Sequence, residues 1–233
     1  MPDPAEPVTE PVATLYEPAP PGGNGTTPAP LAPLIEAAVP TPSSAEVAHP
    51  VPVLDEPGTL VDRLDDRVDA LFDGLRGQPA VDRLMYTVTE LADFSLLWHL
   101  IGAARGATAS DTDRGFAETV RLAAVLGGES MLVNGVLKGL FKRQRPVPDF
   151  ERPLHLRVPL TSSFPSGHAS AAFCSAAILS QTSRGGRLWY AAAALVASSR
   201  VYVKIHHPSD VLAGATVGLT IGLIARKVWR IRR

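Results

Sequence analysis

Two histidines, His168 and His206, stand near the starts of apolar segments that otherwise favour leaving water. Asp210 follows His206 by four residues, and Pro208 between them suits the first turn of a helix. This spacing lets a carboxylate accept a bond from one ring nitrogen, which fixes the tautomer and leaves the other nitrogen free to attack. His168 has no carboxylate nearby in the sequence and lies where it can protonate a leaving oxygen. The pattern indicates a nucleophile and a separate proton donor.

Cationic side chains accompany both histidines. Lys138, Arg145 and Arg200 are multi-donor cations suited to the oxygens of a phosphate group. Ser166 and Gly167 precede His168 at a helix start, where unpaired backbone N–H groups and the helix dipole favour an anion. Glycine also lets an oxyanion approach the backbone without a Cβ in the way. The combination predicts phosphoryl transfer by positioning and electrostatic stabilisation.

Each stretch also has a purely structural interpretation. Residues 165–168 alone could cap a helix, residues 138–145 could be a basic membrane flank, and residues 199–210 could be a loop with a capping aspartate. The functional interpretation would be wrong only if all three structural interpretations were true at once. The functional interpretation is therefore preferred. His207 competes with His206, but it is only three residues from Asp210 and abuts Pro208.

The elements that must position these residues are apolar and helical in pattern. We expect an all-α, membrane-embedded antiparallel bundle of about five spanning helices plus an amphipathic N-terminal helix. The apolar segments are 84–104, 117–141, 167–183, 187–203 and 209–229. Because the motifs fall at the end, start, end and start of consecutive segments, antiparallel packing gathers them at one mouth of the bundle. A soluble all-α bundle is the alternative.

Charge is divided unevenly along the chain. Residues 1–57 hold fifteen of the 22 prolines and eight acidic residues with no Lys or Arg, which predicts a disordered, acidic, proline-rich arm. A partner-binding arm is the alternative. Residues 58–233 form the expected helical domain, in which 59–76 is an amphipathic helix that lies on the membrane surface or covers the bundle. The basic C-terminus follows an apolar span, so a cytoplasmic flank is favoured over nucleic-acid binding.

The three motifs resemble those of the type-2 phosphatidic acid phosphatase superfamily, the lipid phosphate phosphatases. The signature is a Lys, six residues and Arg-Pro, then Pro-Ser-Gly-His, then Ser-Arg, five residues, His, three residues and Asp. Every fixed position is matched, by Lys138, Arg145-Pro146, Pro165 to His168, Ser199-Arg200, His206 and Asp210. The resemblance covers roughly residues 80–229.

The resemblance implies a metal-independent reaction through a phosphohistidine, with no cofactor. If the family's catalytic roles are transferred to the matching positions, His206 is the nucleophile and Asp210 orients it. His168 is then the general acid and later the base. The phosphate-binding residues implied are Lys138, Arg145, Ser166, Gly167 and Arg200. Membrane members often have a six-span core, whereas five apolar segments are counted here.

The expected substrate is a lipid phosphate monoester or diphosphate: a prenyl phosphate or diphosphate, phosphatidic acid, or phosphatidylglycerophosphate. The basic C-terminus, including Arg226, Lys227 and Arg230 to Arg233, places that end in the cytoplasm and the active-site mouth on the outer face of a bacterial plasma membrane. Two alternatives stay open. One is a vanadate-dependent haloperoxidase, and the other is a membrane scaffold that recruits partners through the proline-rich arm.

Overall fold

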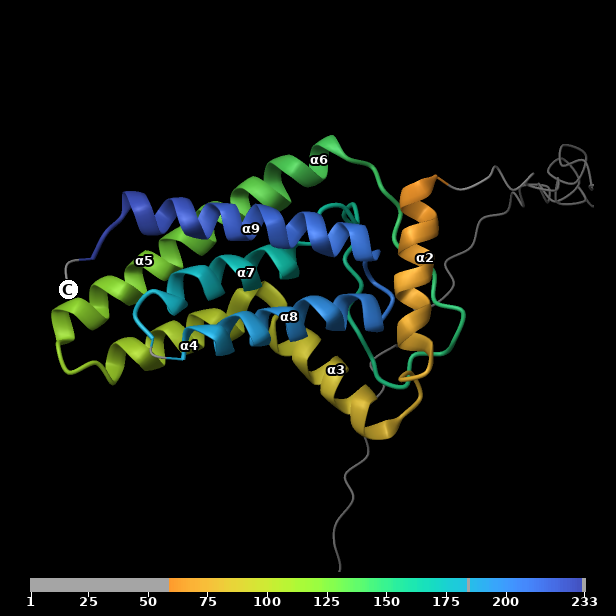
Figure 1. Cartoon of the computed structure of the whole chain (residues 1–233), viewed down its shortest axis with the longest axis horizontal. Helices are drawn as coiled ribbons and strands as arrows, with labels where there is room; N and C mark the ends of the chain where they lie inside the picture. The colour runs from red at the N-terminus through yellow and green to blue at the C-terminus, as the bar shows by residue number, and fades with distance from the viewer. Residues whose placement is uncertain (1–58, 184, 232–233) are drawn as a thin grey trace, which may run out of the picture. The chain divides into compact units, whose positions relative to one another are not determined.

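A computed structural model describes residues 59–183 and 185–231, and every regular element in these ranges is helical. The predictions for the arm at 1–57 and for Arg232 and Arg233 lie outside the described residues. Four helices, α5 (Thr112–Ser130), α7 (Gly167–Ser180), α8 (Gly186–Tyr202) and α9 (Pro208–Val228), run along a common direction (Figure 1). The helix α2 (Leu60–Asp73) crosses one end of this group (Figure 1). The all-helical class is confirmed for the described chain.

The helix α2 begins where the sequence predicts it. Thr59 caps it, because its hydroxyl accepts from the Asp62 backbone N–H at 3.2 Å while the Asp62 carboxylate accepts from the Thr59 N–H at 2.9 Å. This reciprocal capping box satisfies backbone donors that a helix start otherwise leaves open.

The segment 84–104, predicted as one apolar helix, is two helices. The helix α3 (Pro79–Leu91) ends before a short 3₁₀ turn, η1 (Asp93–Ser95), and α4 (Leu96–Ala107) follows. Phe94 and Ser95 have φ of 53° and 58°, so the chain enters the left-handed region at two successive non-glycine residues. Such conformations persist only where the surrounding structure holds them, and apolar periodicity does not reveal them.

The longest helical stretch runs from Thr112 to Leu140 without a break. It consists of α5, the π-helical turn η2 (Met131–Leu137) and the short α6 (Lys138–Leu140). The π-helix is rare, and it occurs often at functional sites. Here the turn directly precedes Lys138.

The contact between α7 and α9 depends on glycine at four-residue spacing. Gly214, Gly218 and Gly222 share one face of α9 and lie against the backbone of α7. A Cβ at Gly214 would overlap the Ser166 carbonyl oxygen, and a Cβ at Gly222 would lie 2.8 Å from the Cys174 carbonyl oxygen. Small residues at this spacing allow helix backbones to approach closely.

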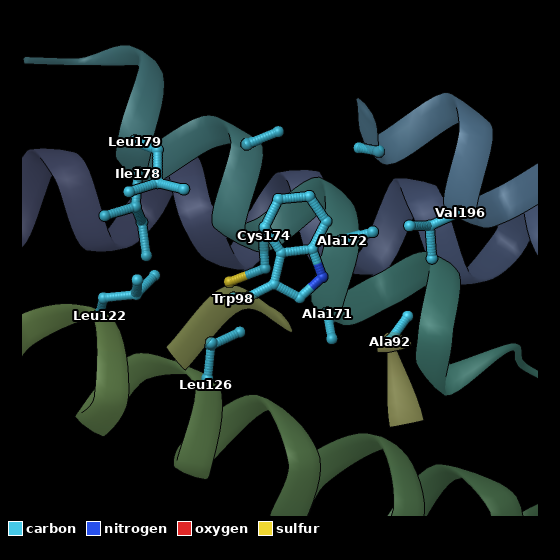
Figure 2. Packing of buried hydrophobic residues seen from close by; sticks show 12 residues of the cluster. Ala92, Trp98, Leu122, Leu126, Ala171, Ala172, Cys174, Ile178, Leu179 and Val196 are labelled. Carbon is cyan, nitrogen blue, oxygen red and sulfur yellow. The ribbon is translucent and has the colours of Figure 1, made fainter. Parts of the chain in front are cut away.

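The apolar core fills the space on the other side of α7. Trp98 of α4 is fully buried and lies beside Cys174, Leu122 and Leu126 (Figure 2). Cys174 is a free, buried thiol, as expected of a small apolar side chain. This core holds α4 and α5 against α7 and thereby sets the position of the residues at the helix ends.

Two described helices are long and apolar enough to cross a membrane, namely Thr112–Leu140 and Pro208–Val228. The helix α7 has 14 residues and α8 has 17, which correspond to about 21 and 26 Å, compared with about 30 Å of hydrocarbon. The count of about five spanning helices therefore stays a prediction.

Candidate active site

The three motif segments meet at the end of the bundle that α2 crosses. The Ser166 N–H, at the start of α7, donates to the Asp210 carbonyl of α9 at 3.0 Å. The His206 N–H donates to the carbonyl of Arg200, the third-last residue of α8, at 3.2 Å. The guanidinium of Arg145 lies 3.2 Å from Nε2 of His206. The structure thus brings together segments that are separated by up to 61 positions in the chain.

Arg145 comes from the long connection between α6 and α7, which has no regular helix. It donates to the carbonyls of Thr161, Ser162 and Ile205 at 3.2, 3.3 and 3.0 Å. These bonds fix its guanidinium over the turn that carries His206. Burial lowers the pKa of Arg145, although the guanidinium stays protonated at any physiological pH.

The ring of His206 is only 2% exposed. An arginine N–H is always a donor, so the contact from Arg145 makes Nε2 of His206 an acceptor. The ring proton therefore belongs on Nδ1, which lies 3.6 Å from Oδ2 of Asp210. Burial, assisted by the charges of Arg200 and Arg145, lowers the pKa of His206 to about 3, so the ring is neutral at physiological pH. A neutral imidazole with its Nε2 lone pair beside the Arg145 cation is suited to nucleophilic attack on an anion that this cation binds.

The carboxylate of Asp210 is itself held by two donors. Its Oδ2 accepts from the His207 backbone N–H at 2.9 Å, and its Oδ1 accepts from Arg143 at 2.7 Å. His207 therefore contributes its backbone at this point. Arg143, within the six-residue gap between Lys138 and Arg145, was not among the predicted site residues. Although its burial alone would lower the pKa of Arg143, its bonds to Asp65 and Asp210 raise that pKa.

Ser166 and Gly167 form the start of α7, as predicted. Ser166 is fully buried and is the N-cap residue, with its hydroxyl 3.5 Å from the Ala169 N–H. Packing also explains why position 167 is a glycine, in addition to any approach of an anion. A Cβ there would lie 2.9 Å from Oδ1 of Asn134 in η2. The absence of that Cβ lets the π-helical turn come close to the start of α7.

His168 pairs with a carboxylate that sequence reasoning missed. Its Nε2 lies 2.8 Å from Oδ1 of Asp93, which belongs to the turn η1, 75 residues earlier in the chain. The left-handed residues Phe94 and Ser95 form the same turn. The sequence signal for Asp93 was its position as an ionisable residue within an apolar segment. Such residues often mark function in membrane proteins, but the sequence does not identify their partners.

Two predicted phosphate-binding cations keep unused donors. Arg200 is 1% exposed and donates from Nη1 to the Thr89 hydroxyl, while its Nε has no partner among the described residues. No side-chain hydrogen bond of Lys138 is found in residues 59–183 and 185–231. A buried donor without a partner is costly, and a bound anion would satisfy it.

An open pocket adjoins this site. It has a volume of about 610 Å³, and it is lined on one side by Lys138, Arg143 and Arg145 and on the other by the segment from Pro159 to Ser162. With Lys142, which also lines it, four cations surround this opening and favour a negatively charged ligand.

Comparison with known proteins is consistent with this geometry. The family model described as PAP2 superfamily matches residues 118–233. A solved PAP2-type phosphatidylglycerolphosphate phosphatase from Bacillus subtilis superposes with a TM-score of 0.56 at 28% identity, covering 75% of this chain and 90% of that one. LpxE from Aquifex aeolicus gives a TM-score of 0.58 at 26% identity, covering 70% of this chain and 95% of that one.

The chain belongs to the PAP2 superfamily. Among its curated relatives is the decaprenylphosphoryl-5-phosphoribose phosphatase of Mycobacterium tuberculosis, which is 34% identical over 96 residues, or 40% of this chain. The chain spans about half the length (51%) of the curated relatives it matches.

All eight predicted site residues fall within the part of the chain that the PAP2 model matches. Asp93, which pairs with His168, and Asp65, which pairs with Arg143, lie before it. The PAP2 model therefore does not include these two carboxylates.

Proposed function

We propose that this PAP2 protein is a membrane phosphatase that hydrolyses a lipid phosphate through a phosphohistidine on His206. The observation that carries the proposal is the buried, neutral His206, whose Nε2 accepts from Arg145 beside a pocket lined by cations. A substrate phosphate would take over the donors of Arg145 and use the free donors of Arg200 and Lys138. These protein cations supply positive charge that phosphoryl transfer needs, which supports a metal-independent reaction.

In the first step, Nε2 of His206 attacks phosphorus while the bond from phosphorus to the lipid oxygen breaks. Asp210 faces Nδ1 and stabilises the positive charge that develops on the ring. His168 enters this step with both ring nitrogens protonated: one N–H donates to Asp93, and the other proton goes to the leaving oxygen. The lipid departs as an alcohol, or as a monophosphate if the substrate is a diphosphate.

In the second step, His168 acts as a base. It takes a proton from water, the water oxygen attacks phosphorus, and the phosphorus–nitrogen bond to His206 breaks. Inorganic phosphate leaves, and both histidines return to their starting protonation states. Asp93 accepts from the ring of His168 and fixes its orientation during both steps.

For the substrate, we propose a phosphate carried on a lipid anchor at the outer membrane–water interface. The similarity to a decaprenylphosphoryl-5-phosphoribose phosphatase favours a polyprenyl-linked phosphate as the first compound to try. Phosphatidylglycerophosphate and phosphatidic acid follow. The site has the same phosphate chemistry toward all of them.

The test is phosphate release by the purified full chain in detergent, from a panel of these lipids and one soluble aryl phosphate, with and without EDTA. We expect release from one lipid class, with the chelator changing the rate by less than about twofold. Loss of activity on chelation, restored by a divalent cation, would contradict the metal-independent mechanism. Release from the soluble ester alone would contradict a lipid substrate, and no release from any compound would favour a scaffold role.

Asp93→Asn is expected to lower kcat for a lipid phosphate by about 10²-fold, which is the low end of what general acid–base catalysis contributes. The amide no longer orients His168 as a carboxylate does. The effect should be much smaller on formation of the phosphoenzyme from p-nitrophenyl phosphate, since nitrophenolate departs without a proton. Single-turnover kinetics with both substrates measures this difference.

Asp113→Asn is the matched control, because Asp113 is exposed in the first turn of α5. It should retain full activity. An equal loss on both substrates in Asp93→Asn, accompanied by a lower melting temperature, would assign Asp93 a role in folding instead.

A further inference from the structure

The helix α2 exposes its apolar side. Leu60 and Leu71 are 72% and 75% exposed, and Val61, Leu64 and Val68 are exposed as well. At about 100° per residue, these five side chains occupy one stripe that is about 100° wide. A helix that simply covers a bundle turns such a stripe inward, and α2 does not.

The contact of α2 with the rest of the domain combines buried and half-buried carboxylates with one aromatic ring, Phe72, which packs against Tyr202. Asp65 is 4% exposed, and Asp69 and Phe72 are half-buried beside it, next to the apolar stripe on the helix wheel. The remaining side of the helix carries exposed charges, among them Asp66, Arg63 and Arg67. The helix therefore has three faces, one apolar, one bound to the domain and one charged.

The three faces match a helix at the edge of a membrane protein, where lipid, protein and water meet. The helix crosses the end of the bundle, whereas α5 and α9 run along it (Figure 1). Among the described residues, α9 and the stretch Thr112–Leu140, which begins with α5, are long and apolar enough to span a membrane. If α5 and α9 span the bilayer, α2 lies along its surface at the level of His206. Arg63 and Arg67 border the apolar stripe beside Leu60, where their guanidinium groups would reach lipid phosphates.

We propose that α2 is an interfacial membrane helix whose apolar face rests in lipid, and that through Asp65 it holds Arg143 against Asp210. The occupant of the exposed face is the headgroup and upper acyl region of the bilayer. The helix α2 recognises the bilayer through its apolar stripe and the two arginines that border the stripe. The placement of α2 stands independently of the enzymatic activity, whereas its effect on turnover rests on the proposed function.

The link from α2 to the site is continuous. Asp65 accepts from the Ser209 N–H at 2.7 Å and from the Ser209 hydroxyl at 2.6 Å, which ties α2 to the start of α9. Its Oδ2 also accepts from Arg143 at 2.7 Å, and the other end of that guanidinium donates to Asp210 at 2.7 Å. Asp210 faces the ring of His206. Displacement of α2 from the surface would therefore free Arg143 and loosen the carboxylate that orients His206.

The placement is tested with spin labels on the full chain in vesicles of phosphatidylcholine and phosphatidylglycerol. Leu71→Cys and Asp66→Cys are labelled separately in a Cys174→Ala background. The measured quantity is the accessibility of each label to molecular oxygen, which concentrates in lipid, and to a water-soluble nickel chelate. We expect the Leu71 label to be accessible to oxygen and shielded from the chelate, and the Asp66 label to show the reverse. Equal access of the chelate to both labels would overturn the proposal.

Other occupants give different signals at the Leu71 label. An immobile label that neither reagent reaches would mean that protein covers the face, from a preceding segment of this chain or from another protein. Spin–spin broadening that disappears on dilution with unlabelled protein would mean a second copy. Either result overturns the lipid assignment. These readouts need no catalysis, so they remain decisive even if no lipid phosphate is hydrolysed.

The link through Asp65 is tested by Asp65→Asn, with Asp66→Asn as the neighbouring control on the charged face. We expect Asp65→Asn to lower kcat about tenfold on both a vesicle-borne and a soluble phosphate, with KM changed by less than about twofold. Asp66→Asn should match the wild type. If Asp65→Asn retains kcat, or loses activity only in proportion to unfolded protein, α2 does not position the site. Partial recovery in Asp65→Glu would support the positioning role.

Discussion

Replacing His206 with alanine is expected to lower phosphate release by about 10⁴-fold or more, because the proposed reaction loses the protein atom that bonds to phosphorus. The ring is buried and its Nε2 accepts from Arg145, and alanine places no nucleophilic atom at that position. The measurement is steady-state release of phosphate from the best lipid of the panel, with melting temperature recorded in parallel.

His155→Ala is the control, since His155 is exposed in the connection between α6 and α7. It should keep wild-type activity. Residual turnover in His206→Ala within about tenfold of the wild type would rule out a phosphohistidine at this position.

The intermediate itself gives a direct test. In His168→Ala, the phosphoenzyme should form from p-nitrophenyl phosphate and then persist, since the base that activates water is missing. A label from ³²P that survives alkali, is lost in acid and maps to the peptide containing His206 is the expected result. A label at any other residue would contradict the assignment.

Gly218→Ala is expected to destabilise the domain by about 3 kcal/mol, the upper end of overpacking effects. A Cβ at Gly218 would overlap the carbonyl oxygen of Ser170 in α7. Because the neighbour is backbone, it cannot rotate away, and α9 must move from α7. The measurement is thermal unfolding in detergent, followed by tryptophan fluorescence.

Gly127→Ala is the matched control for this substitution. Gly127 lies on the exposed side of α5, and a Cβ there meets nothing within 4 Å. Since alanine is the better helix former, this variant should gain about 0.5–1 kcal/mol. A melting temperature for Gly218→Ala equal to that of Gly127→Ala would show that α7 and α9 pack less tightly than the backbone contacts require.

The sequence alone predicted the last three helices and the residues of the proposed site. Apolar periodicity predicts α7, α8 and α9 within a few residues, because each helix is specified by its own side chains. The motifs fall at helix ends, so antiparallel packing was enough to predict that His168, Arg200 and His206 lie near one another. The free, buried Cys174 was also predictable from its apolar surroundings.

Only the tertiary structure identified the partners of these residues. Asp93 reaches His168 because a segment predicted as one helix turns at Phe94 and Ser95, and no glycine or proline marks that turn. Asp65 reaches Arg143 because α2 packs through the edge that carries Asp65, Asp69 and Phe72 and leaves its apolar stripe outward. Periodicity identifies the apolar face of a helix but does not say whether protein or lipid covers it. Pairings between carboxylates and bases 75 or 78 residues apart depend on long-range packing, and sequence spacing carries information only within a helical turn or two.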